Sequence, residues 1–399
     1  MRLLRLLAAP ALLLGRAGGA TLSLDGADWS LRGAGALGDV RVPATVPGGV
    51  WDNLHRAGRV GDPLYRDNDL VYYNATTGAP SDWALSRSFG CGNEFLADGA
   101  AALLEFEGIQ TLATVSLNGK ALLSANNMFR TYRVVLPAGL LKPTGNSLSV
   151  ALHPTPLGPK GTTNPTSNPA EANVGLRDES DAWGWDWSPS LNPRAVYKPV
   201  RLVSASAARP HVLSFSPNVA VTATDDKTKL PTAFLVNASL EVFTAPHDAP
   251  LQAEVVLKGD WQAEAVVTKV TLPPSKVGGV TTVHAQIAAK VKGQQGDGVE
   301  LWWPLHYGEP NLHNLTACLA DRGGSGSCAP GSSVAKKLGF RSVGLYTGPP
   351  APQSPAQVIP LSLPDPVFCL RSTPQMLTKG STGRWTQRAR TRSWAASAT

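Results

Sequence analysis

The sequence lacks the cysteine and histidine spacing that marks a metal site. It holds 4 cysteines and 7 histidines in 399 residues, with no CxxC pair and no ligand-like grouping of histidines. A phosphate-binding glycine loop, an internal repeat and a heptad pattern are missing as well. We therefore predict no metal and no cofactor, and the sequence gives no support for a nucleotide-binding enzyme, a repeat protein or a coiled coil.

A basic surface that could bind nucleic acid is also missing. The formal net charge is +7, but nine of the 36 basic residues lie in residues 1–20 and 371–399, which hold no acidic residue. The remainder has 27 basic against 29 acidic residues. No basic stripe interleaved with aromatic residues is left, so we predict no nucleic-acid partner.

Long apolar runs are scarce, and the clearest one lies at the N-terminus. Residues 6–14 are apolar, follow Arg2 and Arg5, and precede the small residues 18–20. This pattern predicts a secretory signal peptide over residues 1–20, and the alternative is a buried N-terminal helix. The run is too short to span a bilayer. We expect export, either to the outside of the cell or to a lysosome- or vacuole-like compartment.

Two further features agree with the secretory pathway. Cys318 and Cys328 flank the Gly/Ser-rich residues 322–327, which predicts a hairpin disulfide in an oxidising compartment, while Cys91 and Cys369 have no evident partner. The second feature is a set of three N-glycosylation acceptor triplets, which begin at Asn74, Asn237 and Asn314.

Many short strands are predicted by the 39 glycines, the 33 prolines and the repeated alternation of apolar and polar residues. Residues 112–117 alternate in this way and end at the Asn118-Gly119 turn. We predict an all-β chain of two sandwiches, the second of them immunoglobulin-like. The predicted boundaries are 21–207 and 208–346 for the sandwiches, 347–380 for a Pro-rich linker and 381–399 for a basic, disordered tail.

Several ordered blocks resemble the β-mannosidases of glycoside hydrolase family 2, across residues 22–346. The resemblance implies a jelly-roll galactose-binding-like sandwich, and hydrolysis of terminal non-reducing β-D-mannose residues of glycans. Departures are Arg177-Asp178, where the family favours a basic pair, and Ala195-Val196-Tyr197, where it has Gly-Ile-Trp. The blocks that carry the resemblance are 42–50, 62–68, 104–111, 117–119, 127–129, 184–189, 198–200, 301–304 and 338–343.

A tryptophan-rich loop is the most informative of these blocks. Indole rings can stack on the apolar face of a sugar, and a carboxylate can accept hydrogen bonds from its hydroxyl groups. The resemblance implies that Asp186 touches the terminal mannose. We predict Trp185 and Asp186 as substrate-binding residues, whereas Trp183 and Trp187 are candidate aromatic supports that pack the sandwich or seat it on another domain.

The catalytic machinery of the family is not found. Retaining glycosidases need two carboxylates about 5 Å apart, and the resemblance implies that both lie in a (β/α)₈ barrel. Residues 368–380 are similar to a degraded barrel-entry segment, and no acidic residue follows Asp365. We expect no catalytic residue here, and a truncated chain that is inactive without its barrel. Two alternatives stay open: a free-standing secreted carbohydrate-binding protein, and another family 2 exo-glycosidase.

Two smaller expectations concern individual strands. Glu105 and Glu107 alternate along one strand, which is typical of a solvated strand face. Trp302 and Trp303 end a strand, so packing is favoured for them over sugar binding.

Overall fold

The computed structural model describes residues 19–33, 37–69, 82–154, 176–179, 181–182, 186–187, 189, 191, 193–226, 230–293, 298–321, 327–329 and 332–343. Their β-strands confirm the all-β prediction. They form two compact units, a larger one within residues 1–219, 236–288 and 313–338, and a smaller one within 220–235, 289–312 and 339–399. The predicted signal peptide up to residue 18, Asn74, Cys369, the linker and the tail lie outside the described residues.

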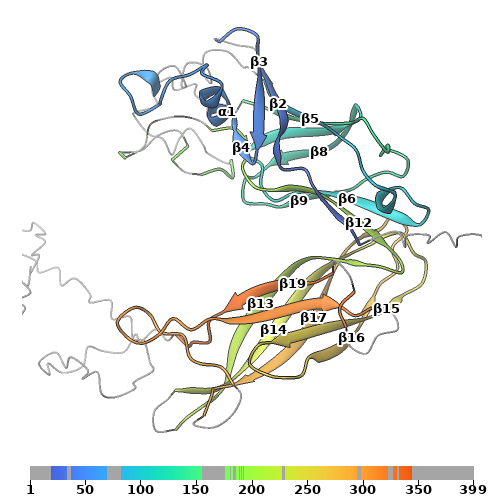
Figure 1. Ribbon diagram of the computed structural model, residues 1–399, viewed down its shortest axis with the longest axis vertical. Helices are drawn as coiled ribbons and strands as arrows, with labels where there is room; N and C mark the ends of the chain where they lie inside the picture. The colour runs from blue at the N-terminus through green and yellow to red at the C-terminus, as the bar shows by residue number, and fades with distance from the viewer. Residues whose placement is uncertain are drawn as a thin grey trace, which may run out of the picture. The chain divides into compact units, whose positions relative to one another are not determined.

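The N-terminal sandwich has two main sheets, drawn as separate layers in Figure 1. One has the order β3-β2-β5-β10-β7-β8, with β2 (Gly26–Gly33), β3 (Val40–Val46), β5 (Trp83–Phe89), β7 (Leu112–Leu117), β8 (Lys120–Asn126) and β10 (Asn146–Leu152). The other has the order β1-β12-β6-β9, with β1 (Thr21–Ser23), β6 (Ala100–Phe106), β9 (Tyr132–Val135) and β12 (Val200–Ser206). Smaller elements are β4 (Gly48–Gly49), α1 (Val50–Arg56), a 3₁₀ turn (Asn93–Phe95) and β11 (Ala195–Val196).

The core of this sandwich lies between the two sheets. Alternate residues of β10 are buried, and the side chains of Leu148, Val150 and Leu152 join the same apolar cluster as Phe106 of the opposite sheet. Trp83 packs closely because residue 33 is glycine: a Cβ there would lie 2.2 Å from the indole ring. Since apolar burial contributes about 25 cal/mol per Å², this cluster is a main source of the sandwich's stability.

The predicted Asn118-Gly119 turn joins β7 to β8. Its residues have φ values of 52° and 81°, the left-handed conformation that a two-residue hairpin needs. The Asn118 side chain is held by three hydrogen bonds: Nδ2 donates to the Leu140 oxygen at 2.7 Å and to Asn146 Oδ1 at 3.1 Å, and Oδ1 accepts from the Ser147 N–H at 2.8 Å.

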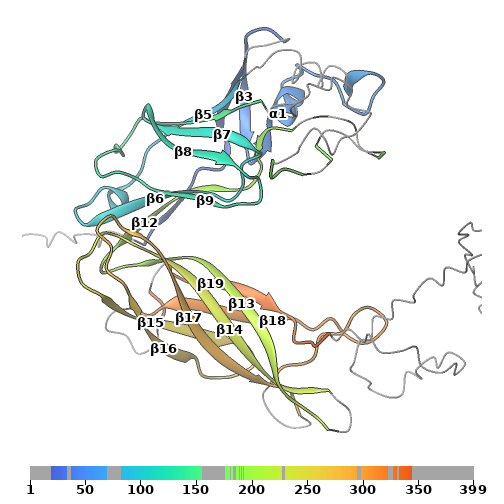
Figure 2. The same cartoon turned by 180° about the vertical axis from the view of Figure 1, so that it is seen from behind.

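The second sandwich is immunoglobulin-like, with seven strands in two sheets. The predicted disulfide is confirmed: Cys318 and Cys328 are bonded, with their Cα atoms 5.6 Å apart. Figure 2 shows these strands from behind. The sheets have the orders β13-β14-β17, with β13 (His211–Thr224), β14 (Pro231–Thr244) and β17 (Gly279–Lys290), and β16-β15-β18-β19, with β15 (Leu251–Gly259), β16 (Val266–Leu272), β18 (His313–Leu319) and β19 (Val334–Leu338).

The expectation of a solvated face at Glu105 is wrong. Only 1% of Glu105 is exposed, because an arginine stands directly opposite it on each neighbouring strand, Arg133 on β9 and Arg201 on β12. The Nε atoms of Arg133 and Arg201 donate to Glu105 at 2.5 and 2.6 Å, and Arg133 Nη1 also donates to Glu241 at 2.9 Å. Burial alone would lower the pKa of Arg133, but these two carboxylates outweigh it and raise that pKa. Within the larger unit, Glu105 therefore forms structural ion pairs with Arg133 and Arg201.

Candidate functional site

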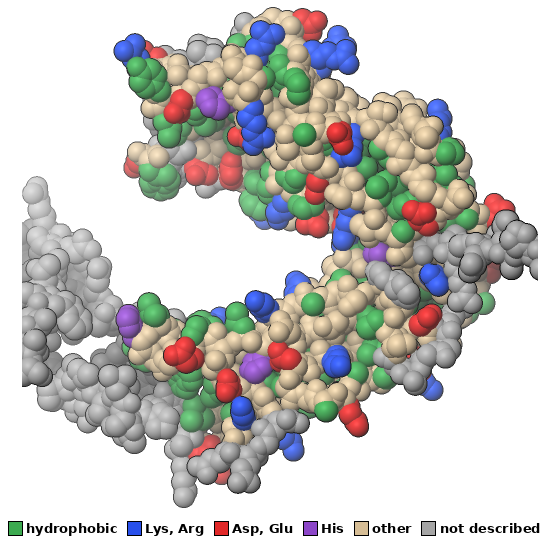
Figure 3. Space-filling view, viewed as in Figure 1, with side chains coloured by type: hydrophobic (Ala, Val, Ile, Leu, Met, Phe, Trp, Pro, Cys, Tyr) green, Lys and Arg blue, Asp and Glu red, His purple; other side chains and the backbone are tan. Residues whose placement is uncertain are grey.

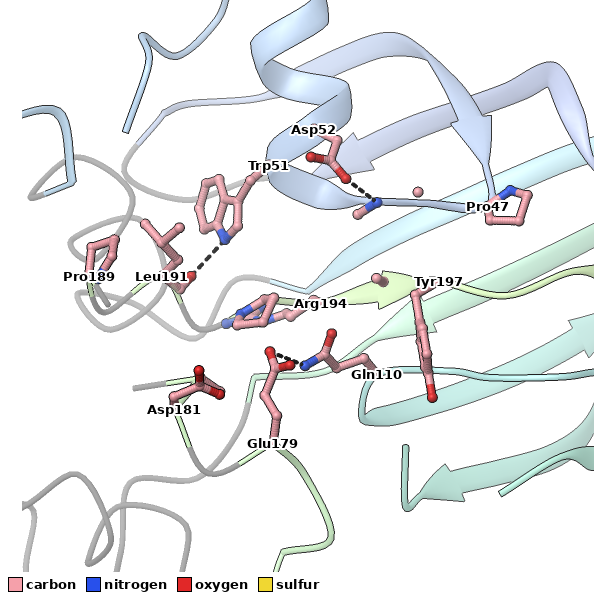
Figure 4. Close-up of a pocket in the computed structure, with 15 residues that line it drawn as sticks. Pro47, Trp51, Asp52, Gln110, Glu179, Asp181, Pro189, Leu191, Arg194 and Tyr197 are labelled. Carbon is pink, nitrogen blue, oxygen red and sulfur yellow. Dashed lines mark hydrogen bonds between the residues drawn. The ribbon is translucent and has the colours of Figure 1, made fainter. Parts of the chain in front are cut away.

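A cavity of about 430 Å³ opens in the N-terminal sandwich beside α1 (Figure 4). Its walls come from three separate parts of the chain: residues 47–52, Gln110, and a third part that begins at Glu179 and ends at Tyr197. This size is within the range of small-molecule binding sites. The cavity is therefore the first place to look for ligand chemistry.

The start of α1 sets the first wall. The Gly49 N–H donates to Asp52 Oδ2 at 3.1 Å, which holds this carboxylate at the helix N-terminus. Asn53 is buried and fixes the turn before the helix, because its Nδ2 donates to the Gly49 oxygen at 2.8 Å and its Oδ1 accepts from the Thr45 N–H at 2.8 Å. The orientation of Asp52 is thus determined by the local backbone.

Gln110 sets the second wall. It is 5% exposed, and its side-chain Nε2 donates to Asp178 Oδ1 at 3.0 Å and to Glu179 Oε1 at 2.9 Å. Its backbone exchanges two hydrogen bonds with Ala195, and the Gln110–Thr111 peptide bond is cis. A neutral amide therefore orients two neighbouring carboxylates at the edge of the cavity.

Aromatic rings form the sides of the cavity, with Trp51 and Tyr197 apart from each other in Figure 4. Trp51 Nε1 donates to the Leu191 oxygen at 2.8 Å. Tyr197 fits beside residue 108 because that residue is glycine, and its hydroxyl donates to the Met128 oxygen at 2.6 Å. Burial raises the pKa of Tyr197, and nearby carboxylates add to the effect.

The charge of the lining is negative. Among the described residues, the lining holds the carboxylates of Asp52, Glu179 and Asp181 and one guanidinium, that of Arg194, which is 2% exposed. Burial lowers the pKa of Arg194 to about 10, partly opposed by the charge of Asp82. Arg194 is therefore still a cation at neutral pH, and the lining carries a formal charge of two negative units.

The predicted loop residues lie next to this cavity along the chain. Asp186 and Trp187 fall between the lining residues Ala182 and Pro189, and neither is part of the lining. Asp186 is exposed and Trp187 is 74% exposed, so Trp187 does not pack into the sandwich core. Trp183 and Trp185 lie outside the described residues.

The five charged or amide residues of the cavity were not predicted from the sequence. Gln110 was inside a block that carried the family resemblance, and that membership was the one available signal. The partner carboxylates are 68 and 69 positions further along the chain, so no periodic pattern joins them. The missed residues are Asp52, Gln110, Glu179, Asp181 and Arg194.

The described residues contain no group of three or more His, Cys, Asp or Glu residues placed to hold a metal ion. In the same ranges, no helix has both the length and the apolar character needed to cross a membrane. On the face shown in Figure 3, acidic and basic side chains are interspersed rather than gathered by sign.

Comparison with known families then identifies the domain that holds the cavity. Residues 29–198 match the family described as glycosyl hydrolase 2 galactose-binding domain-like. This segment is a glycosyl hydrolase 2 galactose-binding-like domain. Every residue that lines the cavity belongs to this galactose-binding-like domain.

The predicted resemblance to β-mannosidases is confirmed by curated relatives. Beta-mannosidase A of Aspergillus aculeatus is 28% identical over 327 residues, which cover 76% of this chain and 32% of the relative. The beta-mannosidase of Rattus norvegicus is 26% identical over 351 residues, which cover 83% of this chain and 36% of the relative. The chain thus spans about a third of the length of the relatives that it matches.

Solved structures confirm the fold. The beta-D-mannosidase of Dictyoglomus thermophilum superimposes with a TM-score of 0.59 at 23% identity, covering 81% of this chain and 36% of that one. The exo-chitosanase of Amycolatopsis orientalis gives a TM-score of 0.56 at 15% identity, covering 81% and 34%. The galactose-binding-like domain and the sandwich after it therefore have an arrangement of strands that is known in glycosidases.

Proposed function

We propose that this chain is the sugar-recognising, non-catalytic portion of a β-mannosidase-type exo-glycosidase, which removes terminal non-reducing β-D-mannose residues from glycans. The similarity to β-mannosidases over 76–83% of the chain supports the substrate class. The observation that carries the proposal is the exposed pair Asp186 and Trp187, on a loop of a galactose-binding-like domain.

The chemistry of this pair suits a sugar. A pyranose ring presents C–H groups on one face and hydroxyl groups around its rim. An exposed indole ring can cover the C–H face, and a carboxylate can accept hydrogen bonds from two adjacent hydroxyl groups. In our proposal Asp186 binds the terminal mannose together with Trp185, and Trp187 supports the same surface.

We propose no catalytic role for the described residues. The two carboxylates of a retaining glycosidase must act as nucleophile and as acid/base. Among the described cavity residues, Asp52 and Glu179 are instead held by the hydrogen bonds of Gly49 and Gln110. We assign the catalytic pair to a barrel domain in the full-length enzyme, consistent with relatives about three times as long as the matched region.

Binding and turnover of mannosides test the proposal separately. Purified residues 1–399 should bind methyl β-D-mannoside more tightly than methyl β-D-galactoside in calorimetric titrations. Asp186→Ala should abolish the preference, whereas the control Asp39→Ala, at an exposed carboxylate of the same sandwich, should keep it. Equal binding of the two glycosides, or an unchanged Asp186→Ala variant, would contradict sugar recognition by this loop. Hydrolysis of an aryl β-mannoside above the blank would contradict the non-catalytic assignment.

We also propose that the chain enters the secretory pathway. The Cys318–Cys328 disulfide supports this route, because such bonds persist in oxidising compartments. Asn314 is exposed, whereas Asn237 is half-buried and its Oδ1 accepts a hydrogen bond from Gln286 at 2.7 Å. After expression in a secretory host, enzymatic deglycosylation should lower the mass, and Asn314→Gln should remove more of this shift than Asn237→Gln. No mass change would contradict the route.

A further inference from the structure

Gly19 and Ala20, the last two residues of the predicted signal peptide, pair with a strand of the first sandwich. The Gly19 N–H donates to the Ser204 oxygen at 3.0 Å, and the Ala20 N–H donates to Ser204 Oγ at 3.0 Å. The Ala20 oxygen accepts from the Ser204 N–H at 2.8 Å. These bonds continue the pairing of β1 with β12 beyond Thr21, so both residues belong to the folded sandwich.

The sandwich would lose several contacts without these two residues. Ser204 is 0% exposed, and its N–H, its carbonyl oxygen and its hydroxyl would all lose the partners that they have in Gly19 and Ala20. Ala20 also packs against the main apolar cluster of the sandwich. Gly19 has a φ of 83°, a left-handed conformation that glycine adopts without strain. The residue types at both positions therefore suit the sheet.

The small residues that a signal peptidase requires occur in three registers. These enzymes cut after an A-x-A-like pattern, in which the last residue and the one two positions before it are small. The later two cuts would remove one or both partners of Ser204, whereas the first would keep both. The three pairs of small residues are Gly15 with Ala17, Ala17 with Gly19, and Gly18 with Ala20.

We infer that the signal peptide is cut after Ala17, so that the mature chain begins at Gly18 and keeps Gly19 and Ala20 in its sheet. A signal peptidase adds water across the peptide bond between residues 17 and 18, which leaves a carboxylate on Ala17 and a free amino group on Gly18. The cut lies before the boundary at residue 20 that the sequence pattern predicts. The inference rests on the proposed secretory route and adds the processing site to it.

The N-terminus of the processed protein tests the inference. Residues 1–399 are expressed in a secretory host, deglycosylated enzymatically, and analysed by N-terminal sequencing and intact mass. We expect Gly18 as the first residue of most molecules. A product that begins at Ala20 or Thr21 would overturn the inference and leave the secretory route standing. A product that keeps Met1, in the cells and in the medium alike, would overturn both.

Two matched variants locate the cut. Valine is too large for the last position of the cleavage pattern but suits a β-strand. Ala17→Val should lower the fraction of molecules that begin at Gly18 about tenfold, and Ala20→Val should leave it unchanged. The N-terminus is read from total cellular protein as well as from the medium, so a variant that does not fold still gives an answer. Blocked processing in Ala20→Val with normal processing in Ala17→Val would overturn the inference.

The Gly19→Ala variant tests the structural reason for this cut. If residue 19 is kept, the mature variant has a larger mass and an alanine in the left-handed conformation, so its midpoint of thermal unfolding should fall by about 2 °C. If the cut lies after Ala20, the mature chains of variant and wild type are identical. A mature Gly19→Ala product with the mass and the unfolding midpoint of the wild type would therefore overturn the inference.

Discussion

Glu105 and Glu179 belong to the same domain and are held in opposite ways. Glu105 is buried between Arg133 and Arg201, so its charge is cancelled inside the protein. Glu179 accepts a hydrogen bond from the neutral amide of Gln110 at 2.9 Å and lines the cavity. The first carboxylate is part of the buried interior of the fold, whereas the second lies at the wall of a cavity.

Removal of the buried charge should have the largest effect. Glu105→Gln leaves two largely buried guanidinium groups without their shared anion, and we expect a loss of about 3 kcal/mol in the free energy of unfolding. Glu179→Gln should cost less than about 1 kcal/mol, because it replaces a group in an open cavity. Urea unfolding of both variants measures this difference, with Glu264→Gln, at an exposed residue, as the control. Equal losses would show that both carboxylates are structural.

Lowering the pH tests whether the buried ion pairs of Glu105 with Arg133 and Arg201 tolerate a further positive charge nearby. His211 is 4% exposed. Burial, and then the nearby charge of Arg201, lower its pKa from 6.5 to about 4. The unfolded chain therefore binds more protons between these values, so stability is complete above about pH 6.5 and falls as the pH drops towards 4.

The expected loss from His211 is about 2 kcal/mol between pH 7 and pH 5. His211→Gln cannot take up this proton and should flatten the same part of the stability profile. Denaturant unfolding at a series of pH values measures both chains. Parallel profiles for the wild type and the variant would show that His211 does not titrate in this way.

A charged residue in place of the neutral donor should have a smaller effect. Gln110→Glu adds a third carboxylate beside Asp178 and Glu179, and we expect a loss of about 1–2 kcal/mol at neutral pH that is regained on acidification. Gln110→Met removes the donor without adding charge and should show no such recovery. Thermal unfolding at two pH values separates the two variants, and an equal pH response would contradict the charge argument.

The smallest effect belongs to a carboxylate that is neither buried nor in the cavity. Glu300 pairs with Lys292 at 3.7 Å, and each side chain is about half exposed. Glu300→Gln should change the free energy of unfolding by less than about 0.5 kcal/mol, and added salt should reduce the change further. A larger loss in chemical unfolding would mean that exposure alone does not separate structural from surface carboxylates here.

The strands with a regular pattern were predicted well from the sequence. The predicted strand 112–117 is β7, and the predicted Asn118-Gly119 turn follows it. Strand β13 was missed because Pro217 interrupts its pattern, and proline removes a backbone donor from the sheet ladder.

The residues of the cavity were not predicted from the sequence, and the substrate-binding role of the tryptophan-rich loop stays a prediction. That loop is visible in the sequence as an unusual local composition. The contact of Gln110 with Glu179 and the burial of Glu105 both depend on how distant segments pair, and no local pattern contains that information. The surroundings of a charged side chain decide its role, and only the three-dimensional structure shows those surroundings.

The Asn118-Gly119 turn has a consequence for the chemical ageing of the protein. An asparagine before glycine is prone to deamidation, in which the following backbone nitrogen attacks the side-chain carbonyl and expels ammonia. Here both ends of the Asn118 amide are held, by the Leu140 oxygen, Asn146 and the Ser147 N–H. The attack requires these bonds to open first, so spontaneous damage at this position should be slow in the folded protein and fast once the hairpin unfolds.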